Sequence, residues 1–62
     1  MSYTRQLLYS IADGMGRNRK EMDPYINVLE KNWYDSLESL RTLSINDYDR
    51  FDIPRRLSAM II

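Results

Sequence analysis

Two helix-start signals lie ten residues apart in the run Leu43-Ser44-Ile45-Asn46-Asp47-Tyr48-Asp49-Arg50-Phe51-Asp52-Ile53-Pro54. Ser44 with Asp47 three residues later has the form of a capping box, in which each side chain accepts a hydrogen bond from the other residue's backbone N–H. Pro54 fits the first position of a helix, and the residue before a proline is biased to an extended conformation. The run therefore predicts one short helix from Ser44 and a last helix from Pro54, with a turn at Ile53.

Three further helices are predicted upstream. The first spans about residues 3–13, where apolar residues recur at helical spacing, and a loop of about nine residues that contains both glycines follows it. The second begins at Asp23-Pro24, a cap followed by a proline, and ends near Asn32. The third begins at Asp35, which has Glu38 three positions on in a capping-box pattern.

The sequence predicts an all-α fold. No segment alternates apolar and polar residues, and no Asn-Gly or Asp-Gly hairpin signal is present. We expect residues 1–62 to form a single domain, a compact bundle of five short helices. The apolar end Met60-Ile61-Ile62 carries no helix cap, so we expect the native sequence to continue in a longer protein. The predicted core is one contiguous cluster: Ile26, Leu29, Trp33, Leu37, Leu40, Leu43, Phe51, Ile53 and Leu57.

Composition excludes several classes of function. The 62 residues include neither cysteine nor histidine, so the commonest nucleophile–base pairs and metal ligands are missing. We expect no enzyme activity, no cofactor and no metal. The absence of cysteine gives no sign of an oxidising compartment, and we expect an intracellular protein. No apolar run approaches the ~18–20 residues that cross a bilayer, so no membrane insertion is expected.

Residues 25–61 resemble a sterile alpha motif (SAM) domain. That family carries the pattern L-T/S-x-x-D-L-x-x-L-G-I before its last helix. Asp52 stands where the family usually has glycine, and Pro54 replaces a longer lead into the last helix. The resemblance implies a five-helix fold and a non-catalytic protein–protein interaction or oligomerisation module. Four residues fall in register with the pattern, and two aromatic residues stand where the family often has leucine: Leu43, Ser44, Asp47 and Ile53, with Tyr48 and Phe51.

The resemblance also implies two contact surfaces. Arg55 and Arg56 follow Pro54 at the start of the last helix, where backbone amides favour an anion, and SAM domains use this end of the helix to bind partners. The middle of the chain is acidic, and the resemblance implies that it docks on the basic surface of another domain. Contact between unlike surfaces produces head-to-tail chains of copies. The expected acidic residues are Asp47, Asp49 and Asp52.

A nucleic-acid-binding module is the alternative. The basic loop contributes Arg17, Arg19 and Lys20, which with Arg55 and Arg56 could follow the phosphates of an RNA hairpin or of DNA. A helix-hairpin-helix DNA-binding domain has a similar helical outline. Nine Lys and Arg balance nine Asp and Glu, however, and phosphate contacts dominate affinity for nucleic acid. The sequence therefore favours a protein partner.

Overall fold

The computed structural model describes all 62 residues and contains helices but no strand. The all-α prediction is confirmed. The elements in chain order are α1 (Tyr3–Met15), the one-turn 3-10 helix η1 (Arg19–Met22), α2 (Asp23–Lys31), α3 (Leu37–Leu40), α4 (Ile45–Arg50) and α5 (Arg55–Ile61). The molecule measures 27 × 24 × 17 Å along its three principal axes.

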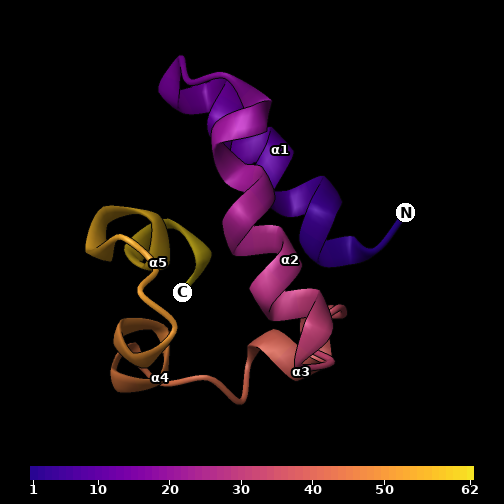
Figure 1. Cartoon of the computed structure of the whole chain (residues 1–62), viewed down its shortest axis with the longest axis vertical. Coiled ribbons are helices and arrows are strands. Elements are labelled where there is room, and N and C mark those ends of the chain that lie inside the picture. Colours follow the sequence, from indigo (N-terminus) through magenta and orange to yellow (C-terminus); the bar gives the residue numbers. More distant parts are fainter.

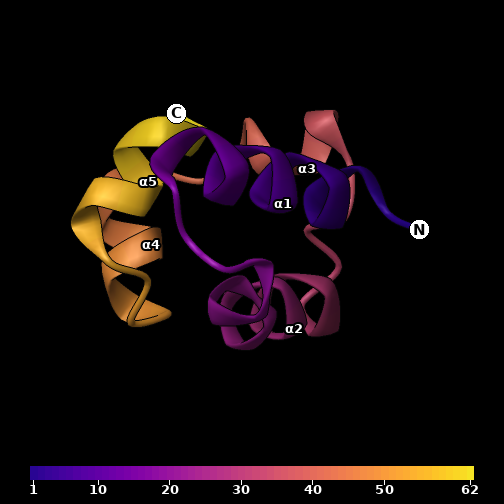
Figure 2. The same ribbon diagram turned by 90° about the horizontal axis from the view of Figure 1, so that it is seen from above.

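Helix α1 is the element on which the others pack. It contacts η1, α2, α3 and α5, and α4 joins the bundle through α5. Figure 1 shows α2 running lengthwise, with α4 and α5 stacked at one side, and Figure 2 shows α1 and α2 in separate layers. Leu8 and Ala12 are wholly buried on the inner face of α1. The core therefore lies between α1 and the rest of the chain.

Six of the nine predicted core residues are buried: Ile26, Leu29, Leu40, Leu43, Ile53 and Leu57. Phe51 is half-buried and packs against Tyr34, with ring centroids 6.0 Å apart. The core also contains five residues that the prediction did not include: Leu8, Ile11, Ala12, Met22 and Tyr48. Three of these five come from α1. The sequence predicted this helix, but the spacing of its apolar residues does not show that the helix lies at the centre of the bundle.

Trp33 is the main error of the predicted core, because 84% of its surface is exposed. It was placed in the core because it continues the apolar spacing of α2, but that helix ends at Lys31. The Tyr34 N–H donates to the Leu29 carbonyl at 2.8 Å, and the Trp33 N–H donates to the Glu30 carbonyl at 3.0 Å. These bonds turn the chain out of the helix, with Trp33 in the left-handed region at φ 70°.

Leu37 is the second error, with 43% of its surface exposed at the first position of α3. Leu37 and Leu40 lie three residues apart on the same side of this single-turn helix, but Leu37 lies at its exposed start and only Leu40 is buried in the core. The N-cap of α3 is Ser36, whose hydroxyl accepts from the Ser39 N–H at 3.1 Å. The predicted Asp35–Glu38 capping box does not form.

The predicted capping box of α4 is confirmed. The Ser44 hydroxyl accepts from the Asp47 N–H at 3.3 Å, and the Asp47 carboxylate accepts from the Ser44 N–H at 2.9 Å.

At α2 the predicted cap is wrong. Asp23 lies inside the helix, and its carboxylate accepts from the Tyr9 hydroxyl at 2.9 Å instead. The predicted nine-residue loop is also shorter than expected, because η1 occupies its second half.

Helices α1 and α2 are joined by a polar cluster at their outer edge. Arg5 donates to Glu30 at 3.0 Å, and Ser2, the N-cap of α1, donates to the same carboxylate. The Arg5 guanidinium, followed by the Ser2 hydroxyl, holds the pKa of Glu30 below its ordinary value. Deeper in, the buried Thr4 hydroxyl donates to the Tyr34 carbonyl at 2.6 Å, which fixes the exit from α2 against α1.

Candidate functional site

The expected basic and acidic surfaces meet within the chain. Arg55 donates to Asp49 at 2.7 Å across the turn between α4 and α5. Asp47 forms the α4 capping box and also an ion pair with Arg50, and these hydrogen bonds hold its pKa below the ordinary value. Asp52 is exposed and forms no ion pair. Its backbone lies in the left-handed region, at φ 57°. The predicted acidic set therefore contains one residue without an ionic partner.

Arg56 differs from Arg55 in having no ionic partner. It is exposed in the first turn of α5, two residues after the exposed Pro54 that precedes the helix. Its side chain stands at the edge of a hollow of about 140 Å³ between the end of α1, η1, α2 and the start of α5. We call this the α5 hollow. It is lined by Met15, Arg17, Glu21, Met22, Tyr25, Pro54, Arg56 and Leu57.

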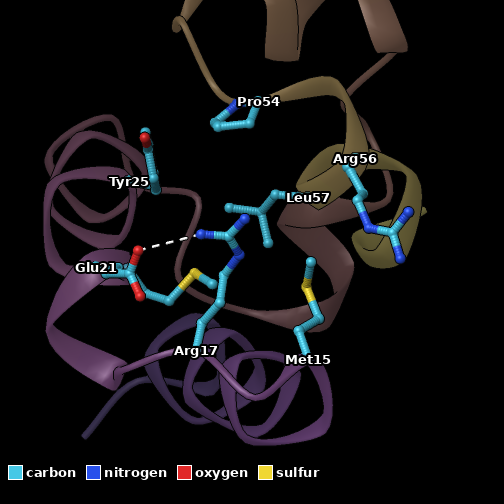
Figure 3. Close-up of a pocket in the computed structure, with 8 residues that line it drawn as sticks. Met15, Arg17, Glu21, Tyr25, Pro54, Arg56 and Leu57 are labelled. Carbon is cyan, nitrogen blue, oxygen red and sulfur yellow. Dashed lines mark hydrogen bonds and ion pairs between the residues drawn. The ribbon is translucent and has the colours of Figure 1, made fainter.

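The α5 hollow is lined by four apolar residues and Pro54, together with the charged side chains of Arg17, Glu21 and Arg56. Figure 3 shows Leu57 near its centre, with Tyr25 and Pro54 on one side and Met15 on the other. Arg17 reaches across it and donates to Glu21 at 3.1 Å, while Arg56 extends away from the centre. Such a surface suits an apolar side chain that is flanked by carboxylates, because the apolar walls accept the first and Arg56 the second.

The predicted basic loop is largely neutralised by acids of the same chain. Arg19 forms two hydrogen bonds with Asp13, at 3.0 and 2.6 Å, and lies over the Tyr9 ring. The Arg19 guanidinium lowers the pKa of Asp13. Arg17 is paired with Glu21, so Lys20 is the one predicted phosphate contact of this loop without an ionic partner. Across the whole chain, four cationic side chains remain unpaired: Lys20, Lys31, Arg41 and Arg56.

Trp33, which was expected in the core rather than as a stacking platform for bases, is exposed. It follows the end of α2, whereas Tyr25 in the wall of the α5 hollow lies near the start of that helix. The acids that follow it, Asp35 and Glu38, are exposed and unpaired. The signal that could have revealed its exposure is Asn32, a residue that often precedes or occupies the end of a helix.

No group of three or more potential metal ligands converges anywhere in the structure. None of the helices has the length and apolar character needed to cross a membrane. The chain matches no family model, and neither a curated protein nor a solved structure is significantly similar to it.

Proposed function

We propose that this protein is a non-catalytic association module, of the SAM-like kind, whose copies bind one another through the start of α5. The α5 hollow is the observation that carries the proposal. It combines apolar walls with Arg56, a cation that no acid of its own chain neutralises. Exposed apolar surface beside an unpaired charge has no role in the stability of the isolated chain, but it suits a partner of opposite charge.

The distribution of unpaired acids supports an acidic surface on the partner copy. Three of the acids without an ionic partner lie in the middle of the chain: Asp35, Glu38 and Asp52. They do not line the α5 hollow. Each copy therefore offers a cationic hollow and, outside it, the unpaired acids Asp35 and Glu38 at the start of α3, and association between them runs head to tail.

The ion pairs favour protein association over binding to nucleic acid. Of the five cations expected to contact phosphates, Arg17, Arg19 and Arg55 already contact acids of their own chain. A phosphate would have to displace those carboxylates, and few counterions would be released on binding. An RNA hairpin serves below as a control ligand.

Charge reversal at Arg56 tests the proposal. We expect sedimentation to show concentration-dependent association of the whole chain, and Arg56→Glu to raise the dissociation constant by about tenfold or more, as like charges then face each other. Association should also weaken with salt, because the screening length falls from about 10 Å at 0.1 M to about 3 Å at 1 M. Circular dichroism should report unchanged helix content.

Arg41→Glu is the matched control, because Arg41 is also exposed and unpaired but lies outside the α5 hollow. It makes the same change in net charge but adds an acid beside Glu38, so it should not weaken association. Arg55→Glu is a poor substitute, since it would place two carboxylates beside each other at Asp49. Equal effects of the Arg56 and Arg41 variants would contradict the proposal. So would a chain that stays monomeric at millimolar concentration, or tight RNA-hairpin binding with a steep salt dependence.

A further inference from the structure

Trp33 combines two features that lower the stability of the isolated chain. Its backbone is in the left-handed region at φ 70°, where a side chain is strained and glycine is not. Its side chain is 84% exposed, so an indole ring lies in water and packs little against the core. A glycine would complete the same helix end, which is made by backbone hydrogen bonds alone. Folding therefore gives no reason for tryptophan at this position.

We propose that Trp33 is the anchor by which one copy of this chain docks in the α5 hollow of another copy. The inference rests on the proposed function and names the partner of that surface. An indole is a rigid apolar group that buries ~150–250 Å² in a contact and is enriched among the residues that dominate interfaces. The α5 hollow offers a volume of about 140 Å³ with apolar walls to receive part of such a ring.

Charge complementarity identifies a second copy as the occupant. Trp33 is followed by Asp35 and Glu38, which are exposed and form no ion pair within the chain. The α5 hollow has Arg56 at its edge, equally unpaired. When the indole enters the hollow, the unpaired acids approach the unpaired cation. The same chain thus carries both an apolar anchor flanked by acids and an apolar hollow flanked by a cation.

The two surfaces lie toward opposite ends of α2, so a chain cannot fill its own hollow. Tyr25 lines the hollow near the start of this helix, and Trp33 follows its end. A helix rises about 1.5 Å per residue, so the helical residues from Tyr25 to Lys31 separate the two positions by roughly 9 Å along its axis. Figure 1 shows the start of α2 beside the end of α1 and its far end beside α3. Docking is therefore intermolecular and leaves one free anchor and one free hollow at the ends of every open assembly.

Trp33→Gly separates this role from a structural one, because it should raise stability and abolish association together. Removing the left-handed strain should raise Tm by roughly 4–8 °C for a domain of this size. Loss of an interface anchor should raise the dissociation constant for self-association by roughly 30-fold or more. Sedimentation of the whole chain measures the second quantity, and thermal unfolding followed by circular dichroism measures the first.

Two further variants serve as controls. Trp33→Ala removes the ring but keeps a side chain at positive φ, so it should lose association without the gain in Tm. Met60→Ala removes another exposed apolar side chain, on α5 and outside the hollow, and should associate as the unmodified chain does. A fall in Tm for Trp33→Gly would show that the ring supports the fold and would overturn the proposal.

Mixing two variants gives the decisive test. Trp33→Gly keeps an intact hollow, and Arg56→Glu keeps an intact Trp33. Each should be monomeric alone at a concentration where the unmodified chain associates, and together they should form a one-to-one dimer that does not grow. The absence of that dimer would overturn the inference.

The outcomes also distinguish this inference from the proposed function. If Arg56→Glu weakens association while Trp33→Gly does not, another segment fills the hollow, and the proposed function stands without Trp33. If Arg56→Glu associates like the unmodified chain, the proposed function fails whatever Trp33 does. If the unmodified chain remains monomeric at millimolar concentration, both fail.

Discussion

Tyr48 is fully buried, yet its hydroxyl group has no hydrogen-bond partner. Burial removes the group from water, which disfavours the charged phenolate and raises the pKa of Tyr48. The ring itself packs in the core as part of α4. A buried polar group without a partner costs roughly 1–3 kcal/mol of stability. The hydroxyl of Tyr48 therefore opposes the fold that its ring stabilises.

Tyr48→Phe is expected to stabilise the protein. The variant keeps the ring and removes the unpaired hydroxyl, so the free energy of unfolding should rise by about 1 kcal/mol. For a chain of this length that corresponds to a Tm increase of roughly 4–8 °C, measured by circular dichroism.

Tyr3→Phe is the control for that substitution, because Tyr3 is 41% exposed and lies outside the buried core. It should leave Tm unchanged. A loss of stability in Tyr48→Phe would contradict the prediction, since it would mean that the hydroxyl contributes favourably to the folded state.

Single residues were the hardest level to predict from the sequence. Trp33 fits the apolar spacing of α2, and only the hydrogen bonds that end the helix at Lys31 turn it outward. Tyr48 was predicted within the correct helix, but its complete burial depends on how α4 packs with α5. Spacing predicts the face of a helix on which a residue lies. It does not predict whether that face is covered.

At the scale of elements, short-range hydrogen bonds made several boundaries predictable. Ser44 and Asp47 bond each other over three residues, so the start of α4 is a local property of the sequence. At α3 the predicted cap was Asp35, but the adjacent Ser36 also has a polar residue three positions on. The structure uses Ser36, and Leu40 then reaches the core. Such a choice depends on tertiary packing.

Ser44→Ala tests how much α4 depends on its cap. The helix has six residues, too few to be stable without tertiary contacts and satisfied ends. Removing the hydroxyl removes the capping bond to the Asp47 N–H, which then keeps only its bond to the Ser44 carbonyl, and we expect a loss of about 1 kcal/mol in the free energy of unfolding. Urea denaturation should show a lower midpoint with an unchanged slope.

Ser10→Ala is the matched control, because Ser10 is exposed in the interior of α1 and caps no helix. Alanine has the higher helix propensity, so this change should be neutral or slightly stabilising. If both variants had the same midpoint, the capping box would have no measurable effect on stability.

At the scale of the whole molecule, the stability of the fold depends on α1. For 62 residues the expected free energy of unfolding is only about 3–9 kcal/mol. Leu8 is wholly buried on α1, and truncating a buried leucine costs about 2–5 kcal/mol. We therefore expect Leu8→Ala to unfold a large fraction of the chain at 25 °C, as measured by loss of helical circular dichroism.

Trp33→Ala is the control for Leu8→Ala, because it removes a larger side chain that is exposed instead of buried. Because the ring is exposed, its removal should change the free energy of unfolding by less than about 0.5 kcal/mol. A large loss for Trp33→Ala, or a negligible one for Leu8→Ala, would contradict the assignment of the core.

The sequence predicted which charged residues belong to the candidate site, but not which of them form ion pairs with each other. The sequence identified Arg55, Arg56 and the acids of the middle segment as the charged groups near the last helix. Asp49 and Arg55 lie six residues apart, with Pro54 between them, and the turn before α5 brings them together. That turn therefore determines that Arg55 is paired with an acid and that Arg56 has no ionic partner. The apolar walls of the α5 hollow come from α1, η1 and α2 and could not be assembled from a local pattern.

The position of Trp33 also determines what fluorescence can report about this protein. It is the single tryptophan, and 84% of it already contacts solvent in the folded chain. Its emission should therefore be red-shifted and open to quenching by iodide before any denaturant is added, and it should change little when the dilute monomer unfolds. A flat fluorescence trace beside a sharp circular-dichroism transition would resemble a folding intermediate, since coincident probes are the usual test of two-state behaviour. In this molecule the same mismatch would reflect only where the indole lies.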